Sequence, residues 1–270
     1  MSALLYGRAL KAVVWREVLR FTGQRGRFVA ALVRPLVWLL VFAAGFRAAL
    51  GVSVQPPYET YITYETYIVP GLLAMVLLFN GMQSSLSMVY DREMGSMRLL
   101  LVSPVRREFL LAAKLLAGAA VGILQCFAFL AVAALTGIEV PPAGWLAVVP
   151  ALLLAGLMLG ALGMVLSSTV RQLENFAGVM NFVIFPTFFL SSALYPLWKM
   201  RESSEILWTI CAANPFTHAV ELIRFALYGQ VGWEALGWVS LATLVFLGLS
   251  FWAYNPAKGL MARKAGAGEG

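Results

Sequence analysis

The sequence predicts an all-α polytopic membrane protein with six transmembrane helices. Of its 270 residues, 61% are hydrophobic and 12% are charged, whereas soluble domains carry about 25% charged residues. Apolar stretches of a length that crosses a bilayer as a helix alternate with short polar connections. Lys and Arg gather in alternate connections, which is the asymmetry expected of membrane helices with a defined orientation. We therefore expect one membrane domain over residues 1–270.

The elements can be assigned in chain order. Residues 1–27 are basic and place Leu10, Val14 and Val18 on one helical face, which predicts an amphipathic helix lying on the inner leaflet. Six expected spans follow, at residues 28–50, 67–90, 109–136, 145–170, 176–194 and 236–254. Residues 197–235 are too polar for a clean span, so we expect short outer-face helices there, partly re-entrant and broken at Asn214-Pro215.

Charge predicts the orientation of the spans. The connections after the first and third spans contain no Lys or Arg, whereas the amino-terminal segment, the loop at residues 91–108 and the carboxyl-terminal tail are basic. The positive-inside rule then places both termini and this loop in the cytoplasm. Arg34 and Arg47 lie near the two ends of the first expected span, and we expect them to reach nearby lipid head groups. The net charge of +7 is explained by lipid and topology and does not indicate nucleic-acid binding.

A charged segment, residues 91–104, separates the second and third spans. Helical spacing places Tyr90, Met94 and Met97 on one face, and Ser103-Pro104 marks the end of the helix. The segment therefore predicts a small amphipathic helix at the membrane surface with a mixed apolar and charged face. Such a helix suits contact with a soluble partner, although an ordinary positive-inside loop explains the same charges.

Motifs for catalysis in this chain are absent. The sequence contains no G-x-x-x-x-G-K-[ST] phosphate loop, no H-E-x-x-H and no G-x-S-x-G. Cys126 and Cys211 have no paired spacing, and His218 is the one histidine, so no metal site or cofactor is expected. Within the expected spans we identify no Asp or Glu pair, and no Lys, that would act as a proton or ion relay.

Uncharged polar side chains inside the expected spans can be interpreted in two ways. Interhelical hydrogen bonding is favoured over substrate contact for the amides and hydroxyls, among them Gln125. The candidate substrate pathway consists of Asn80, Gln83, Phe182, Phe185 and Phe189. The patterns Gly118-x-x-x-Gly122 and Gly156-x-x-x-Gly160 predict close helix packing. Glu221 and Arg224, three residues apart on one helix, are expected to pair locally.

Four features in order resemble the permease subunit of an ABC-2 type transporter. They are the basic amphipathic amino-terminal helix, the Tyr67-Ile-Val-Pro70-Gly71 opening of the second span, the 91–104 segment, and Asn214-Pro215-Phe216-Thr217 before the last span. The resemblance covers essentially the whole chain. Residues 95–118 look particularly like permeases associated with alcohol-oxidation systems.

The resemblance implies that this chain works together with a separate ATPase subunit. The segment that would dock on a separate ATPase subunit as a coupling helix is Asp91, Arg92, Glu93, Met94, Gly95, Ser96, Met97 and Arg98. ATP and Mg²⁺ would bind to that subunit, and the permease would work in the bacterial inner membrane with a second copy of itself or a related permease, in contact with membrane lipids.

The expected function is therefore ATP-driven export of a lipid-like, glycan or small organic substrate. Two alternatives belong to other classes. A secondary transporter should show inverted repeats or buried carboxylates, and an integral membrane enzyme should show a cluster of His, Asp or Glu near one interface. Neither feature is clear in the sequence, where only His218 and Glu221 come close to such a cluster.

Overall fold

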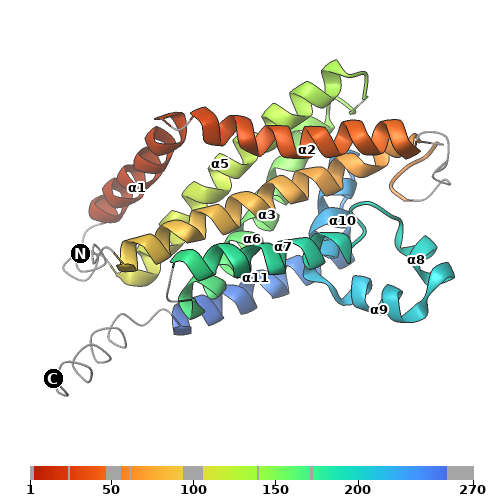
Figure 1. The fold of residues 1–270 in the computed structure, drawn as a ribbon. Coiled ribbons are helices and arrows are strands. Elements are labelled where there is room, and N and C mark those ends of the chain that lie inside the picture. The colour runs from red at the N-terminus through yellow and green to blue at the C-terminus, as the bar shows by residue number, and fades with distance from the viewer. Residues whose placement is uncertain are drawn as a thin grey trace.

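The fold is helical throughout the part of the chain that the structure describes. This computed structural model describes residues 3–23, 25–46, 56–60, 62–93, 106–138, 140–170 and 173–253. The helices are α1 (Ala3–Gly23), α2 (Arg25–Phe46), α3 (Tyr64–Glu93), α5 (Arg107–Leu135), α6 (Gly144–Thr169), α7 (Leu173–Phe189), α8 (Leu197–Ser203), α9 (Glu205–Ala213), α10 (Pro215–Leu227) and α11 (Trp233–Ala253) (Figure 1). The expected all-α class is confirmed.

Four described helices are long and apolar enough to cross a membrane. They are α3, α5, α6 and α11, and the bent pair α9–α10 would make a fifth, with an angle of 74° at the break. The remaining two expected spans correspond to shorter apolar stretches, Leu32–Val41 in α2 and Gly178–Phe189 in α7. A multi-pass membrane protein is thus supported, while the sixfold crossing stays a prediction.

Helix α3 forms the centre of the bundle and packs against α2, α5, α6, α7 and α10. Its contacts are close because glycines line them. A Cβ at Gly81 would lie 3.0 Å from the backbone of Leu159 and Gly160 in α6. Gly156 and Gly160 of α6 in turn face Ala119 and Leu115 of α5. The predicted close packing of the glycine patterns is therefore confirmed.

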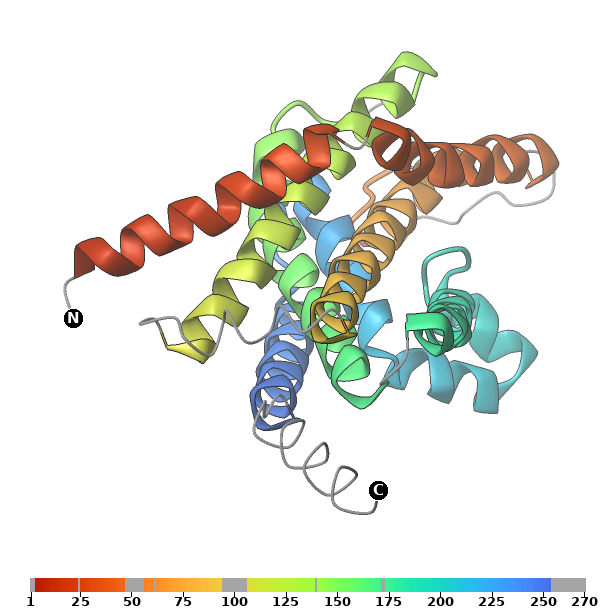
Figure 2. The same cartoon turned by 60° about the vertical axis from the view of Figure 1, so that its left-hand side comes forward.

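The two ends of the bundle differ. Figures 1 and 2 show α1 extending from the end at which α3 finishes and α5 begins, whereas α8 and α9 lie at the opposite end. Helix α1 is joined to α5 by an edge-to-face contact of Tyr6 with Phe109, 4.8 Å between ring centroids. Trp15 and Leu19 of α1 remain exposed, as an interfacial helix requires.

Some boundaries differ from the prediction. Helix α7 ends at Phe189, five residues before the expected end of that span, and a turn follows. The Ser191 hydroxyl donates to the Phe188 carbonyl and accepts from the Ala193 amide, so this side chain competes with continued helix. Helix α3 begins at Tyr64, three residues earlier than expected.

Candidate functional site

The expected docking segment is only partly described. Residues 91–93 form the last residues of α3, so the backbone of the central helix continues without interruption from Tyr64 to Glu93. Residues 94–105 lie outside the described residues. The assignment of Asp91 to Arg98 as a docking element therefore stays a prediction, and the described part establishes its continuity with α3.

Asn80 and Gln83 of the candidate pathway line a polar pocket between α2, α3 and α5. The other lining residues are Arg34, Pro35, Met75, Val76, Phe79 and Gln125. Asn80 donates a hydrogen bond of 2.7 Å from Nδ2 to the Gly118 carbonyl of α5, which is the interhelical bond favoured for such groups. The carbonyl Oε1 of Gln125 is buried and has no hydrogen-bond partner among the described residues.

Arg34 of α2 lies against an aromatic ring of α3. Its guanidinium carbon lies 3.9 Å from the centroid of the Phe79 ring. Phe79 is near the middle of α3, roughly 20 Å along the axis from either end at 1.5 Å per residue. Arg34 is exposed as well as in contact with this ring, so its reach to a lipid head group stays a prediction. Arg47 lies outside the described residues.

The three phenylalanines of the candidate pathway lie on a different feature. Phe182, Phe185 and Phe189 of α7 expose 80%, 43% and 43% of their surface, so together they form an aromatic strip on the outside of the chain. Phe189 contacts Trp38 of α2 at 5.6 Å between centroids and stacks on Phe185 at 6.3 Å. The pocket and the strip are thus two separate candidates, with α2 contributing to both.

Sequence reasoning missed the contacts that the buried Arg224 makes outside its own helix, at the end of the bundle where α8 and α9 lie. Arg224 of α10 is 1% exposed and pairs with Glu221, which confirms the expected local pair. Its Nη2 also donates to the Ser192 carbonyl at 3.0 Å, and its guanidinium lies 4.2 Å from the Tyr67 ring centroid. The Tyr67 hydroxyl donates to the same carbonyl at 3.0 Å. This Arg224 cluster therefore joins α10, the turn after α7 and the start of α3.

The surroundings of this cluster are aromatic. Tyr58 packs edge-to-face on Tyr228 at 4.9 Å and lies 6.5 Å from Tyr67. Burial raises the pKa of the Tyr58 hydroxyl, so this group stays neutral beside the arginine. Gly71 completes the contact, because a Cβ there would overlap the Ala193 carbonyl oxygen. This close approach explains a glycine after Pro70 at the start of the second expected span.

Asn214 organises the break between α9 and α10. Its Oδ1 accepts from the Phe216 amide and caps α10, while its Nδ2 donates to the Thr187 and Leu190 carbonyls at 2.8 and 2.6 Å. One side chain thus starts α10 and satisfies the end of α7. The predicted break at Asn214-Pro215 is confirmed.

His218 also has a structural setting. It hydrogen bonds to the Ala212 carbonyl at 3.0 Å and stacks on Trp238 at 5.3 Å. Among the described residues no group of three or more His, Cys, Asp or Glu side chains could hold a metal ion.

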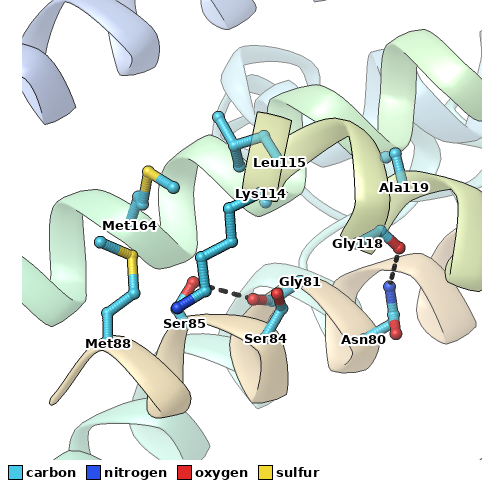
Figure 3. Close-up of a pocket in the computed structure, with 12 residues that line it drawn as sticks. Asn80, Gly81, Ser84, Ser85, Met88, Lys114, Leu115, Gly118, Ala119 and Met164 are labelled. Carbon is cyan, nitrogen blue, oxygen red and sulfur yellow. Dashed lines mark hydrogen bonds between the residues drawn. The ribbon is translucent and has the colours of Figure 1, made fainter. Parts of the chain in front are cut away.

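Lys114 is a second charged residue inside the bundle. It is 9% exposed and lies in the candidate span Glu108–Leu135 of α5. The expectation that no Lys in the spans acts as a proton or ion relay stays a prediction. In Figure 3 Lys114 extends toward Ser85 of α3, in a pocket that also includes Met88 and Met164. The position of Lys114 within a span was predictable from the sequence, because this residue falls inside the predicted span 109–136.

Comparison with known proteins agrees with this architecture. The chain is 27% identical over 267 residues to ycf38 of Cyanophora paradoxa, which is named as a transport permease. The alignment covers 97% of this chain and 86% of that protein. Nodulation protein J of Rhizobium leguminosarum bv. viciae is 25% identical, with 80% of this chain and 82% of the relative covered. YbhR of Escherichia coli K12, named as a multidrug ABC transporter permease, is 29% identical over 62% of this chain and 45% of its own length.

A family model covers most of the same region. The model of the ABC-2 type transporter membrane family matches residues 8–228, from α1 to the end of α10. This range contains the central helix α3, the break at Asn214 and the Arg224 cluster, so the features described above lie within the matched region. The chain belongs to the ABC-2 type transporter family.

Proposed function

We propose that this chain is the permease subunit of an ATP-driven exporter, moving an amphiphilic substrate outward with energy from a separate ATPase subunit. Membership of the ABC-2 type transporter family is the observation that carries this proposal. The sequence contains no phosphate loop, so ATP and Mg²⁺ would bind on the ATPase. The energy of ATP binding and hydrolysis on the ATPase would then have to reach the permease through a contact at its surface.

Helix α3 is the element best suited to receive that contact. It runs for 30 residues without a break and ends in the docking segment Asp91–Arg98. It also packs against α2, α5, α6, α7 and α10, so movement at its end reaches most of the bundle. We infer that the apolar side chains Met94 and Met97 enter a cleft of the ATPase, while the neighbouring charges set orientation at the rim.

Charge placed on this apolar face tests the coupling. The double variant Met94→Asp, Met97→Asp should abolish substrate-stimulated ATP hydrolysis and transport, because buried interface anchors contribute more than rim charges. The measurement is ATPase activity of the co-purified complex in lipid vesicles. Met200→Asp, on α8 at the opposite end of the bundle, is the control and should leave stimulation intact. Normal transport by the double variant would remove the docking role from this segment.

The substrate class is inferred from the surfaces and from the relatives. The candidate pathway offers an aromatic strip on α7 and a polar pocket beside α3, a combination that suits an amphiphile, such as a lipid, a glycolipid or a small organic compound. One relative is named as a multidrug transporter permease and another as a nodulation protein. The narrower resemblance to permeases of alcohol-oxidation systems stays a prediction.

Two permeases are expected in each complex. One chain supplies one docking segment, whereas the resemblance to the ABC-2 type permeases implies two, so a second copy or a related permease would supply the other. Mass measurement of the detergent-solubilised complex should give two permeases and two ATPases. A complex with one permease per two ATPases would contradict this arrangement.

A further inference from the structure

The polar pocket beside α3 contains groups that the packing of the bundle leaves incompletely satisfied. Arg34 rests on the Phe79 ring, and no ion pair to its guanidinium is found in the described part of the chain. Gln125 is 5% exposed and its Oε1 has no hydrogen-bond partner among the described residues. A buried acceptor without a donor is costly, and Arg34 next to it is exposed with no anion from the described residues beside its guanidinium, which indicates that a ligand completes the pocket.

The chemistry of the lining defines that ligand. A guanidinium binds phosphate or carboxylate through charge-assisted hydrogen bonds. A free amide carbonyl accepts from a hydroxyl or an N–H group. Met75, Val76 and Pro35 supply an apolar wall next to these groups. The combination fits an anionic head group that carries a hydroxyl and is attached to an aliphatic chain.

We propose that the pocket of Arg34, Phe79, Asn80, Gln83 and Gln125 binds the anionic, hydroxyl-bearing head group of an amphiphile. Arg34 neutralises the anion and Gln125 accepts from the hydroxyl. The same chemistry has two sources, a bilayer lipid that stays bound and an amphiphile that is transported. The second source rests on the proposed function, whereas binding itself does not.

Lipid retention tests the pocket directly. The full-length permease is reconstituted in nanodiscs of phosphatidylcholine with phosphatidylglycerol, released into detergent, and its retained lipids are counted by native mass spectrometry. We expect wild-type protein to retain phosphatidylglycerol over phosphatidylcholine, and Arg34→Gln to lose about tenfold or more of this preference. Arg201→Gln is the matched control, because Arg201 also lies over an aromatic ring, Trp208 at 5.0 Å, but outside the pocket.

A second variant protects the test against misfolding. Gln125→Glu keeps the side-chain size and places a carboxylate in the same pocket as Arg34, so it should also lose the preference because it competes with the lipid phosphate. Size-exclusion profiles and circular dichroism report whether each variant folds, and Gln125→Glu decides the result if Arg34→Gln does not fold. Absence of a preference in wild-type protein, or an unchanged preference in either folded variant, would overturn the proposal.

Adding the ATPase subunit and ATP separates the two sources. A resident lipid remains bound during turnover, whereas a transported amphiphile is depleted from the pocket. Either result leaves the binding site in place and identifies its occupant. If the variants lose the lipid preference but keep normal coupled ATP hydrolysis, the site is supported and its occupant is a resident lipid. Lipid retention therefore tests the site, whereas coupled ATP hydrolysis tests the exporter function.

Discussion

Arg224 shows how one buried charge can join three parts of this chain. Its partners are a carboxylate one turn earlier on α10, a carbonyl in the turn after α7 and the ring of Tyr67 in α3. A charge in such a position is stabilising only while its partners remain, because each partner has also been removed from solvent. The cluster therefore makes the end of the bundle dependent on a single side chain.

Removing this charge should destabilise the protein strongly. Arg224→Met leaves Glu221 without its partner and the Ser192 carbonyl without one of its donors, so we expect a loss of about 3–5 kcal/mol in unfolding free energy. Thermal unfolding of the detergent-solubilised permease, followed by fluorescence-detected size exclusion, measures this effect. Adding Glu221→Gln should recover part of the loss, because it removes the unpaired carboxylate. A double variant less stable than Arg224→Met would contradict this account.

At the scale of elements, the bent pair α9–α10 depends on Asn214. The backbone turns by 74° at this point, and Pro215 occupies the first turn of α10, where a missing N–H costs nothing. The Asn214 side chain then serves both helices, because it caps α10 and donates to two carbonyls at the end of α7. A break in an apolar segment is tolerated here because its polar backbone groups are satisfied by protein.

Replacing Asn214 should loosen both helices. Asn214→Ala removes a cap worth about 0.5–2 kcal/mol and leaves the Thr187 and Leu190 carbonyls without this donor. The expected result is a lower unfolding temperature and faster hydrogen exchange in both α10 and the end of α7. Ser204→Ala, which removes the exposed cap of α9, is the matched control and should have a smaller effect. Equal effects of the two substitutions would argue against the double role.

At the scale of the whole molecule, the two ends of the bundle are formed by different elements. The basic helix α1 and the approach to the docking segment lie at one end, and α8 and α9 lie at the other (Figure 1). This division agrees with the orientation predicted from charge, in which both termini face the cytoplasm. The first connection, which contains Glu59, would then face outward.

Cysteine labelling tests that orientation. The two native cysteines are buried and are first replaced in a Cys126→Ala, Cys211→Ala background. A membrane-impermeant maleimide added to intact cells should label Glu59→Cys and should label Ser96→Cys only after the membrane is opened. Glu59 is exposed in the structure, so its labelling reports orientation rather than burial. Labelling of Ser96→Cys in intact cells would reverse the topology.

Local composition was sufficient for much of this architecture. The helical class, several span boundaries and the break at Asn214-Pro215 follow from apolar length, charge and proline chemistry, each of which acts within a short stretch of chain. The Glu221–Arg224 pair was also predictable, because a separation of three residues on a helix brings two side chains together. The family followed from several such stretches in order along the chain.

The polar contacts between helices could not be obtained in the same way. The second partner of Arg224 lies 32 residues away at Ser192. Arg34 contacts Phe79 and lines one pocket with Gln125 because α2, α3 and α5 pack together. A hydropathy pattern reports that a segment is apolar, but it does not report which face of one span meets which face of another. For that reason the surroundings of Arg34 and Lys114 were not predicted, and the pocket beside α3 emerged from the packing of the bundle.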